Sequence, residues 1–128
     1  MRKVQYDWEC IIVNEPIRIL HVIGKMGRGG AETMIMNIYR QIDRNKIQFD
    51  FAVHTENKEA YDDEIISMGG KIYKFSKFMG MNIYNYTHEW KQFLKEHNEY
   101  KIIHGHIGSC ASVYLQIAKK NGIVTIAH

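Results

Sequence analysis

The sequence predicts an α/β protein with a Rossmann-like, doubly wound parallel sheet of about five strands in three layers. Short runs of branched apolar residues, which are typical of buried strands, recur along the chain. Segments with apolar residues at helical spacing separate these runs, and a glycine-rich loop follows the first of them. Because helical crossovers join parallel strands, this alternation indicates one parallel sheet with helices on both faces.

The first strand is expected at 17–23, after Pro16, and a helix at 30–42 follows a loop with four glycines in seven residues. Its apolar face would include Met34, Ile35 and Ile38, whereas Met26 in the loop would be exposed. Glycines at 69–70 and 122 are expected to end two later helices. Further strands are expected at 48–54, 71–75, 101–106 and 123–127, and further helices at 59–68, 84–97 and 109–121. Aromatic residues of the 84–97 helix, Tyr84 among them, would face the core.

Length and composition indicate one soluble domain. The 128 residues are 45% hydrophobic and 24% charged, which is ordinary for a globular fold. We expect a leader at 1–16, in which 10–13 could add a strand, and a domain at 17–128 whose sheet is incomplete at the C-terminus. The net charge of +3 is spread along the chain, so a nucleic-acid-binding arm is not expected.

No stretch reaches the roughly 20 apolar residues of a membrane span, and the N-terminus lacks a secretory signal. The sequence therefore predicts a cytoplasmic protein, and its mildly basic surface leaves peripheral association with the inner face of the membrane open. The two cysteines, Cys10 and Cys110, have no metal-finger spacing and are expected to be free thiols. A disulfide between them stays open.

The glycine loop at 24–30 is the first candidate site. Glycines let backbone N–H groups approach a ligand, and the start of the following helix favours a phosphate or carboxylate. The loop lacks the Lys-Ser/Thr of a P-loop, and Glu32 stands where a dinucleotide fingerprint needs its third glycine. ATP hydrolysis and NAD binding are therefore poorly supported. The alternative is a mobile turn without a ligand.

Four histidines fall at or near the carboxyl ends of predicted strands: His54, His104, His106 and His128. His104 and His106 share one face of a strand, so they could bind a metal together with an acidic residue from elsewhere. No carboxylate neighbours them in sequence, and a core position is the favoured interpretation of His104. His106 and His128 are expected nearer the crevice, where a histidine can donate a hydrogen bond or transfer a proton.

Four segments in order resemble bacterial glycosyltransferase family 4 proteins. Residues 17–23 and 27–32 are similar to the apolar strand and Gly-Gly-Ala-Glu loop that open this family. Residues 102–106 resemble its fourth strand with two alternating histidines. Residues 124–128 resemble the end of its fifth strand, where a functional histidine often lies. The resemblance runs from Ile17 to His128.

The resemblance implies a GT-B fold, in which the N-terminal domain mainly holds the acceptor and the C-terminal domain holds most of the nucleotide sugar. It implies transfer with retention, no metal or other cofactor, and His128 as the catalytic candidate beside the transferred sugar. The residues expected to bind substrate are Gly27, Gly29, Gly30, Glu32 and His106. Since the C-terminal domain is absent from the sequence, we expect this chain alone to be inactive and to need that domain in cis or in a partner chain.

Within the family, the motifs are most like those of transferases for capsule, exopolysaccharide or O-antigen, which implies a lipid-linked or polysaccharide acceptor. Two other hypotheses stay open. The chain could be a stand-alone nucleotide- or anion-binding module without catalysis. It could also be a non-catalytic interaction domain whose exposed last strand pairs with another chain.

Overall fold

Residues 15–128, described here by a computed structural model, form a single sheet of five parallel strands. The strand order is β3-β2-β1-β4-β5, so the chain crosses from one edge of the sheet toward the other between β3 and β4. This confirms the predicted Rossmann-like α/β fold, and each strand ends within one or two residues of its predicted position. The strands are β1 (Ile17–Val22), β2 (Ile47–Val53), β3 (Ile72–Lys74), β4 (Ile102–Gly105) and β5 (Val124–Ala127).

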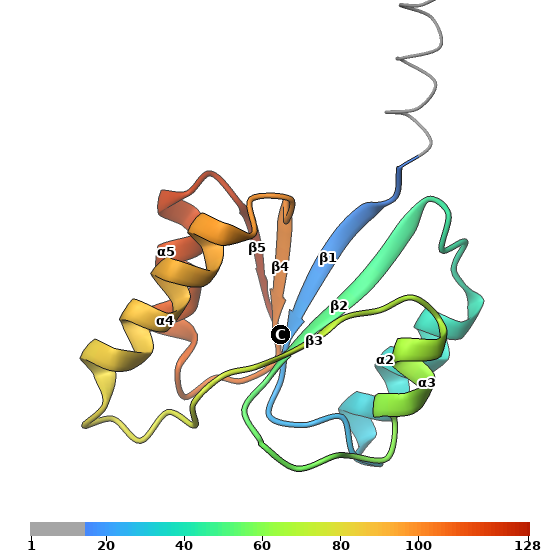
Figure 1. The fold of residues 1–128 in the computed structure, drawn as a ribbon, viewed down its shortest axis with the longest axis horizontal. Coiled ribbons are helices and arrows are strands. Elements are labelled where there is room, and N and C mark those ends of the chain that lie inside the picture. Colours follow the sequence, from blue (N-terminus) through green and yellow to red (C-terminus); the bar gives the residue numbers. More distant parts are fainter. Residues whose placement is uncertain (1–14) are drawn as a thin grey trace, which may run out of the picture.

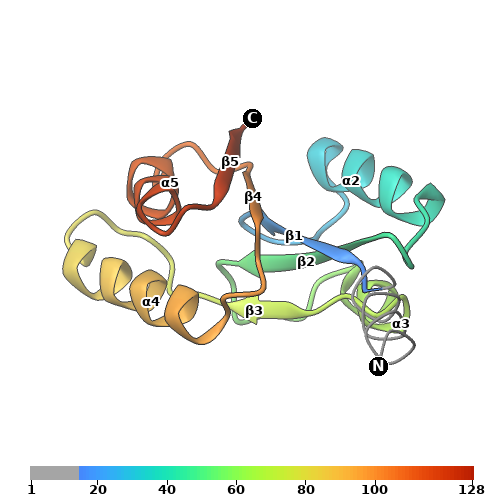
Figure 2. The ribbon, with the colours of Figure 1, turned by 90° about the horizontal axis from the view of Figure 1, so that it is seen from above.

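Helices cover both faces of the sheet and complete three layers. Figure 1 shows α4 and α5 on one side of the strands, and α2 and α3 on the other. The view from above in Figure 2 shows the same division, with the sheet between the two pairs. The helices are α2 (Gly30–Gln41), α3 (Asp62–Ser67), α4 (Ile83–Glu96) and α5 (Ala111–Lys120). None of the helices in residues 15–128 is both long and apolar enough to cross a bilayer.

Each face of the sheet has its own apolar core. Under α4 and α5, the fully buried Trp90 stacks on Phe75, with ring centroids 4.2 Å apart, and also on Tyr114. Under α2 and α3, Tyr39 stacks on Phe49 with a centroid distance of 5.2 Å. Because strands buried on both faces must be apolar on both sides, these cores explain the near-continuous apolar runs that predicted the strands.

Glycines end two helices and allow one close packing contact. Gly69 and Gly122 follow α3 and α5 with φ of 91° and 73°, a region that glycine adopts without strain, as the sequence predicted. Gly105 ends β4 beneath α5, and a Cβ there would collide with the phenol ring of Tyr114. Glycine at 105 therefore lets α5 pack directly against β4.

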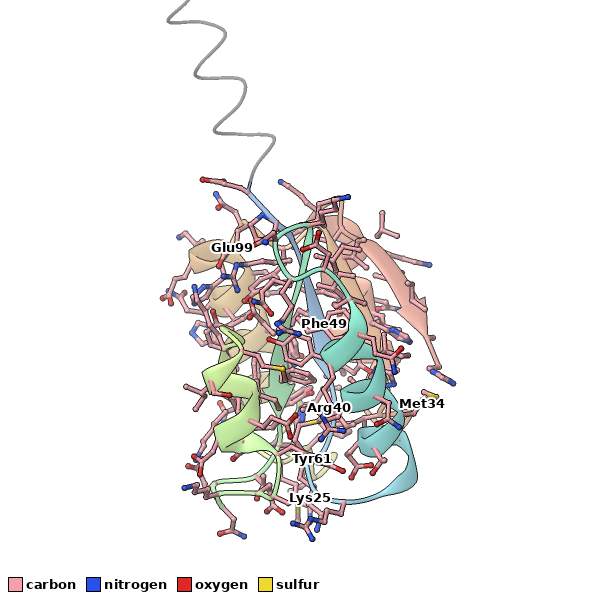
Figure 3. The ribbon with its side chains drawn as sticks, turned by 90° about the vertical axis from the view of Figure 1, so that its right-hand side faces the viewer. Lys25, Met34, Arg40, Phe49, Tyr61 and Glu99 are labelled. Carbon is pink, nitrogen blue, oxygen red and sulfur yellow. The ribbon has the colours of Figure 1, made fainter. Side chains whose placement is uncertain are left out.

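Three details of the predicted packing are wrong. Met34 and Ile38 of α2 are 42% and 48% exposed, because the buried stripe of this helix runs through positions 35, 36 and 39. In Figure 3, Met34 lies on the side of α2 away from α3, whereas Arg40 lies between the two helices. Met26 is fully buried, since its loop folds under α3 and its carbonyl accepts a hydrogen bond from the backbone of Tyr61. Tyr84 is 87% exposed. It lies two positions before the buried Tyr86, so its side chain leaves the opposite side of α4.

The predicted leader at 1–16 falls almost wholly outside the described residues. The same holds for the strand expected at 10–13 and for Cys10, so neither prediction is tested. Cys110 is a buried free thiol at the start of α5.

Candidate functional site

The carboxyl ends of all five strands meet at one edge of the sheet, where open α/β proteins bind their ligands. The loop between β1 and α2, the histidines and a cavity all lie at this edge. In Figure 3, Lys25 of that loop lies at the end of the molecule that holds the carboxyl ends of the strands, and Glu99, before β4, lies at the opposite end.

The glycine loop leaves the start of α2 open. The N-cap residue is Gly29, which has no side chain, so no side-chain cap bonds the first N–H groups of the helix. A Cβ on Gly30 would have no heavy atom within 4 Å, whereas a Cβ on Gly29 would meet the carboxylate of Glu32 at 2.5–3.0 Å. Gly27 is buried, and a Cβ on it would lie 3.6 Å from a carboxylate oxygen of Glu59. Glu32 therefore lies at the positive end of the helix dipole. An incoming anion would have to displace this carboxylate or bind beside it at the start of the helix.

Four histidine rings cluster on the α2 side of the same edge. The β1–β4 register places His21 opposite His104. His106 and His128 continue β4 and β5, held by backbone hydrogen bonds of 2.8 and 2.9 Å to neighbouring strands. The His21 Nδ1 and His106 Nε2 atoms are 3.1 Å apart, close enough for one to donate to the other. The His128 ring lies 5.6 Å from that of His104 and 5.5 Å from that of His106, measured between centroids.

Burial keeps three of these rings neutral at pH 7. It lowers the pKa of His21 to about 3, and the nearby His106 and His104 act in the same direction. Burial also lowers the pKa of His106 to about 4, with smaller effects from His104 and His128. The pKa of His104 is lowered by burial and by His128. Because a second positive charge is unfavourable in so small a space, the cluster resists protonation as a unit.

A cavity of about 650 Å³ opens at the carboxyl edge on the α4–α5 side. Most of its wall is apolar, with Phe75, Phe78 and Ile107 among the lining residues, and the exposed Lys25 and Lys77 also belong to the lining. The wall is built from the loops after four strands, residues 24–25, 54–56, 75–78, and 107, 109 and 110.

The wall of this cavity includes a buried polar chain. The Nδ1 atom of His54 faces the carbonyl of Ile23 at 3.1 Å, and because a carbonyl only accepts, Nδ1 carries the proton. The Nε2 atom of His54 then accepts from the Tyr86 hydroxyl at 2.7 Å, which also lies 3.2 Å from the Cys110 sulfur. Burial lowers the pKa of His54, partly opposed by the Ile23 carbonyl and Glu89. The ring is therefore neutral and fixed in one tautomer.

The residues predicted to bind substrate or to act in catalysis all lie at the carboxyl edge, but none of them lines this cavity, whose lining does include Gly24 and Lys25 of the predicted loop and the candidate histidine His54. They belong to the glycine loop, the start of α2 and the histidine cluster, and their assigned roles stay predictions: Gly27, Gly29, Gly30, Glu32, His106 and His128. His21, which brings its ring into the cluster from β1, was not predicted from the sequence, and neither were the wall residues at 75–78. Their position at the end of the predicted strand 71–75 and directly after it was the signal that could have found them.

Comparison with known proteins gives two relatives in sequence. The chain is 39% identical over 89 residues to EpsF of Bacillus subtilis, whose name assigns it provisionally as a glycosyltransferase. It is 26% identical over 91 residues to CapH of Staphylococcus aureus, named a capsular polysaccharide biosynthesis glycosyltransferase. The alignments cover 70% and 71% of this chain but only 23% and 24% of those proteins. No family model matches the chain.

Among solved structures, the chain is similar to MurG of Acinetobacter baumannii. The TM-score is 0.62 at 14% sequence identity, over 88% of this chain and 35% of MurG. This likeness shows a shared Rossmann-like fold. The chain is thus similar in sequence to a part of two proteins named as glycosyltransferases, and similar in fold to a part of MurG.

Proposed function

We propose that this chain is the acceptor-side, N-terminal Rossmann-like part of a glycosyltransferase of the GT-B type that uses a nucleotide sugar. The observation that carries the proposal is the 39% identity to EpsF over 89 residues. The carboxyl edge supports it, because an open helix start, polar side chains and an apolar cavity are gathered there. A second domain, in cis or in a partner chain, would face this edge and hold most of the donor.

The proposed reaction is a sugar transfer that retains the anomeric configuration. The bond between the anomeric carbon and the diphosphate oxygen breaks, and the nucleoside diphosphate leaves with the electron pair. A bond forms from the acceptor hydroxyl oxygen to the same face of that carbon, while the hydroxyl proton passes to a diphosphate oxygen. Negative charge develops on the diphosphate, so donors fixed in advance around it lower the barrier.

In this proposal the glycine loop and the histidines serve the donor. The open start of α2 at Gly29 and Gly30 offers N–H groups to the diphosphate. Glu32, whose carboxylate only accepts, would bind sugar hydroxyls rather than phosphate, and Gly27 would keep the loop close to the ligand. His128 is exposed at the end of β5 and would hydrogen-bond the transferred sugar, with His106 behind it.

The cavity on the α4–α5 side is proposed as the acceptor site. Its mostly apolar wall suits a lipid or an apolar sugar face, and the exposed Lys25 and Lys77 in its lining could bind a phosphate that links the two. This supports a lipid-linked intermediate of capsule, exopolysaccharide or O-antigen synthesis as acceptor. Such a substrate would bring the enzyme to the inner face of the membrane.

The proposal is tested first by the length of the native gene product. If the reading frame continues past His128 into a second α/β domain, the longer protein should release nucleoside diphosphate from one nucleotide sugar of a panel when a lipid-linked acceptor is added. The 128-residue chain alone should not. A native product that ends at His128, acts without a partner chain and binds a nucleotide tightly by itself would instead establish the binding-module alternative.

In the longer protein, His128→Ala is expected to lower kcat by about 10²–10³-fold, because it removes a hydrogen bond to the transferred sugar that becomes stronger in the transition state. KM for the nucleotide sugar should change little. The matched control is His88→Ala, an exposed histidine on α4, which should keep wild-type kcat. Unchanged kcat in His128→Ala would remove His128 from the mechanism.

Gly30→Val is expected to raise KM for the nucleotide sugar at least about tenfold, because the branched side chain fills the space at the start of α2. Since no heavy atom lies within 4 Å of that Cβ, the fold should be unaffected. Gly30→Ala is the graded control and should have a smaller effect. Equal KM values in all three proteins would show that the diphosphate binds elsewhere.

A further inference from the structure

Three of the clustered histidines converge as metal ligands do. His21, His104 and His106 each offer a ring nitrogen, and the three nitrogens lie within 4.8 Å of one another. With Zn–N bonds of about 2.0–2.1 Å, ligand nitrogens in a tetrahedral site lie about 3.3 Å apart. The nitrogens of His21 and His106 are already 3.1 Å apart. The third nitrogen lies at most 4.8 Å from the other two, so the set is close to the spacing of a tetrahedral site.

Two of these rings also contain nitrogens that nothing else satisfies. Within residues 15–128, three buried side-chain nitrogen or oxygen atoms lack a hydrogen-bond partner, and two of them are the Nε2 atoms of His21 and His104. His21 is only 4% exposed. Because an unpaired buried polar group is unfavourable, such atoms need a physical reason. A bound cation would supply it for His104. One cation cannot take both nitrogens of an imidazole, so if His21 binds through the Nδ1 atom that faces His106, its Nε2 atom stays outside the coordination sphere.

The chemistry of the three ligands selects the type of cation. Neutral imidazole is the form that binds metals, and burial keeps these rings neutral. Imidazole nitrogen favours Zn²⁺, Cu²⁺, Ni²⁺ and Co²⁺, whereas Mg²⁺ and Ca²⁺ prefer oxygen. The three-residue cluster contains no carboxylate. A cation of the zinc class is therefore favoured over a magnesium-class ion.

We propose that His21, His104 and His106 form a binding site for one Zn²⁺-class cation, with a fourth coordination position open at the carboxyl edge. The histidines come from β1 and from the end of β4, so two neighbouring strands fix the site. The proposal does not depend on the glycosyltransferase function, and it assigns the cation no step in sugar transfer.

The test is a Co²⁺ titration of the 128-residue chain prepared without a histidine tag, followed by visible absorption. Tetrahedral Co²⁺ gives strong visible bands, which Zn²⁺ should abolish by displacement and Mg²⁺ should not. One Co²⁺ per chain is expected. His106→Ala and His104→Gln should each weaken binding at least about tenfold. His88→Ala, which alters an exposed histidine on α4, is the matched control and should bind as the wild type does.

Circular dichroism of each variant establishes that the fold is retained, and His106→Ala is the safer variant because its ring is only half-buried. Absence of tetrahedral bands in the wild type would overturn the proposal. So would equal Co²⁺ affinity in His106→Ala, His104→Gln and wild type, because the metal would then be bound by other groups. Neither result depends on whether the longer protein transfers sugar.

Discussion

Substitution of Asp50 by alanine is expected to lower the free energy of unfolding by about 3–5 kcal/mol. Asp50 lies in the middle of β2 with a fully buried side chain. Its two oxygens each lie 2.9 Å from Arg18 Nη1, and one of them accepts a 2.6 Å hydrogen bond from the Tyr100 hydroxyl. The backbone N–H of Lys71 donates to the other at 2.8 Å. One carboxylate thus connects β1, the start of β3 and the approach to β4.

The size of this effect comes from the groups that the substitution leaves behind. A buried ion pair adds little net stability, but removal of one partner leaves the other without compensation. Without Asp50, the Tyr100 hydroxyl and the Lys71 N–H lose a charged acceptor inside the sheet. Arg18 keeps 25% of its side chain exposed, so water can reach it in part. This exposure favours the lower part of the range.

Urea unfolding at pH 7 measures the effect. The control is Asp63→Ala, which removes an aspartate whose ion pair with Lys58 is 70–77% exposed, and it should change the free energy of unfolding by less than about 1 kcal/mol. A loss below about 1 kcal/mol for Asp50→Ala, with an unchanged urea dependence, would contradict the importance given to this network.

The fold was predictable because local signals agreed along residues 17–128. Short apolar runs predicted the five strands of residues 15–128, and the first of these runs is bounded by Pro16 and Gly24. The glycines at 69 and 122 ended helices as expected. The side-chain details were less predictable, because they depend on partners far away in sequence. Tyr39 is buried rather than Met34 since Gln48 of β2 bonds its hydroxyl and Phe49 stacks on its ring. Helical spacing alone could not show those partners.

The sequence predicted at which edge of the sheet the candidate site lies, but not which residues form its walls. Histidines at the ends of predicted strands correctly placed His54, His104, His106 and His128 at the carboxyl edge. The contribution of His21 depends on the β1–β4 pairing, which joins residues 83 positions apart and left no local pattern. The cavity likewise combines loops after four strands. Its shape could be known only once the strand order was known.

The metal-free protein should lose about 2 kcal/mol of stability between pH 6.5 and pH 5 through His21 alone. Burial lowers the pKa of His21 from 6.5 to about 3, so the unfolded chain binds a proton in this range and the folded protein does not. The stabilising effect is complete above pH 6.5, and it decreases by about 1.4 kcal/mol per pH unit as the pH falls toward 3. The lowered pKa values of His54, His104 and His106 act in the same direction.

Urea unfolding in a chelating buffer at pH 7, 6 and 5 would measure this dependence. Glutamine does not titrate, so in His21→Gln the free energy of unfolding should depend less steeply on pH. The difference should correspond to about one proton over this range, whatever the stability of the variant at pH 7. The His21 ring also gives a direct test by NMR, because its resonances should stay constant from pH 7.5 to pH 5 while the protein is folded. A ring that takes up a proton near pH 6.5 would mean that water reaches it, and the buried, neutral cluster would then be wrong.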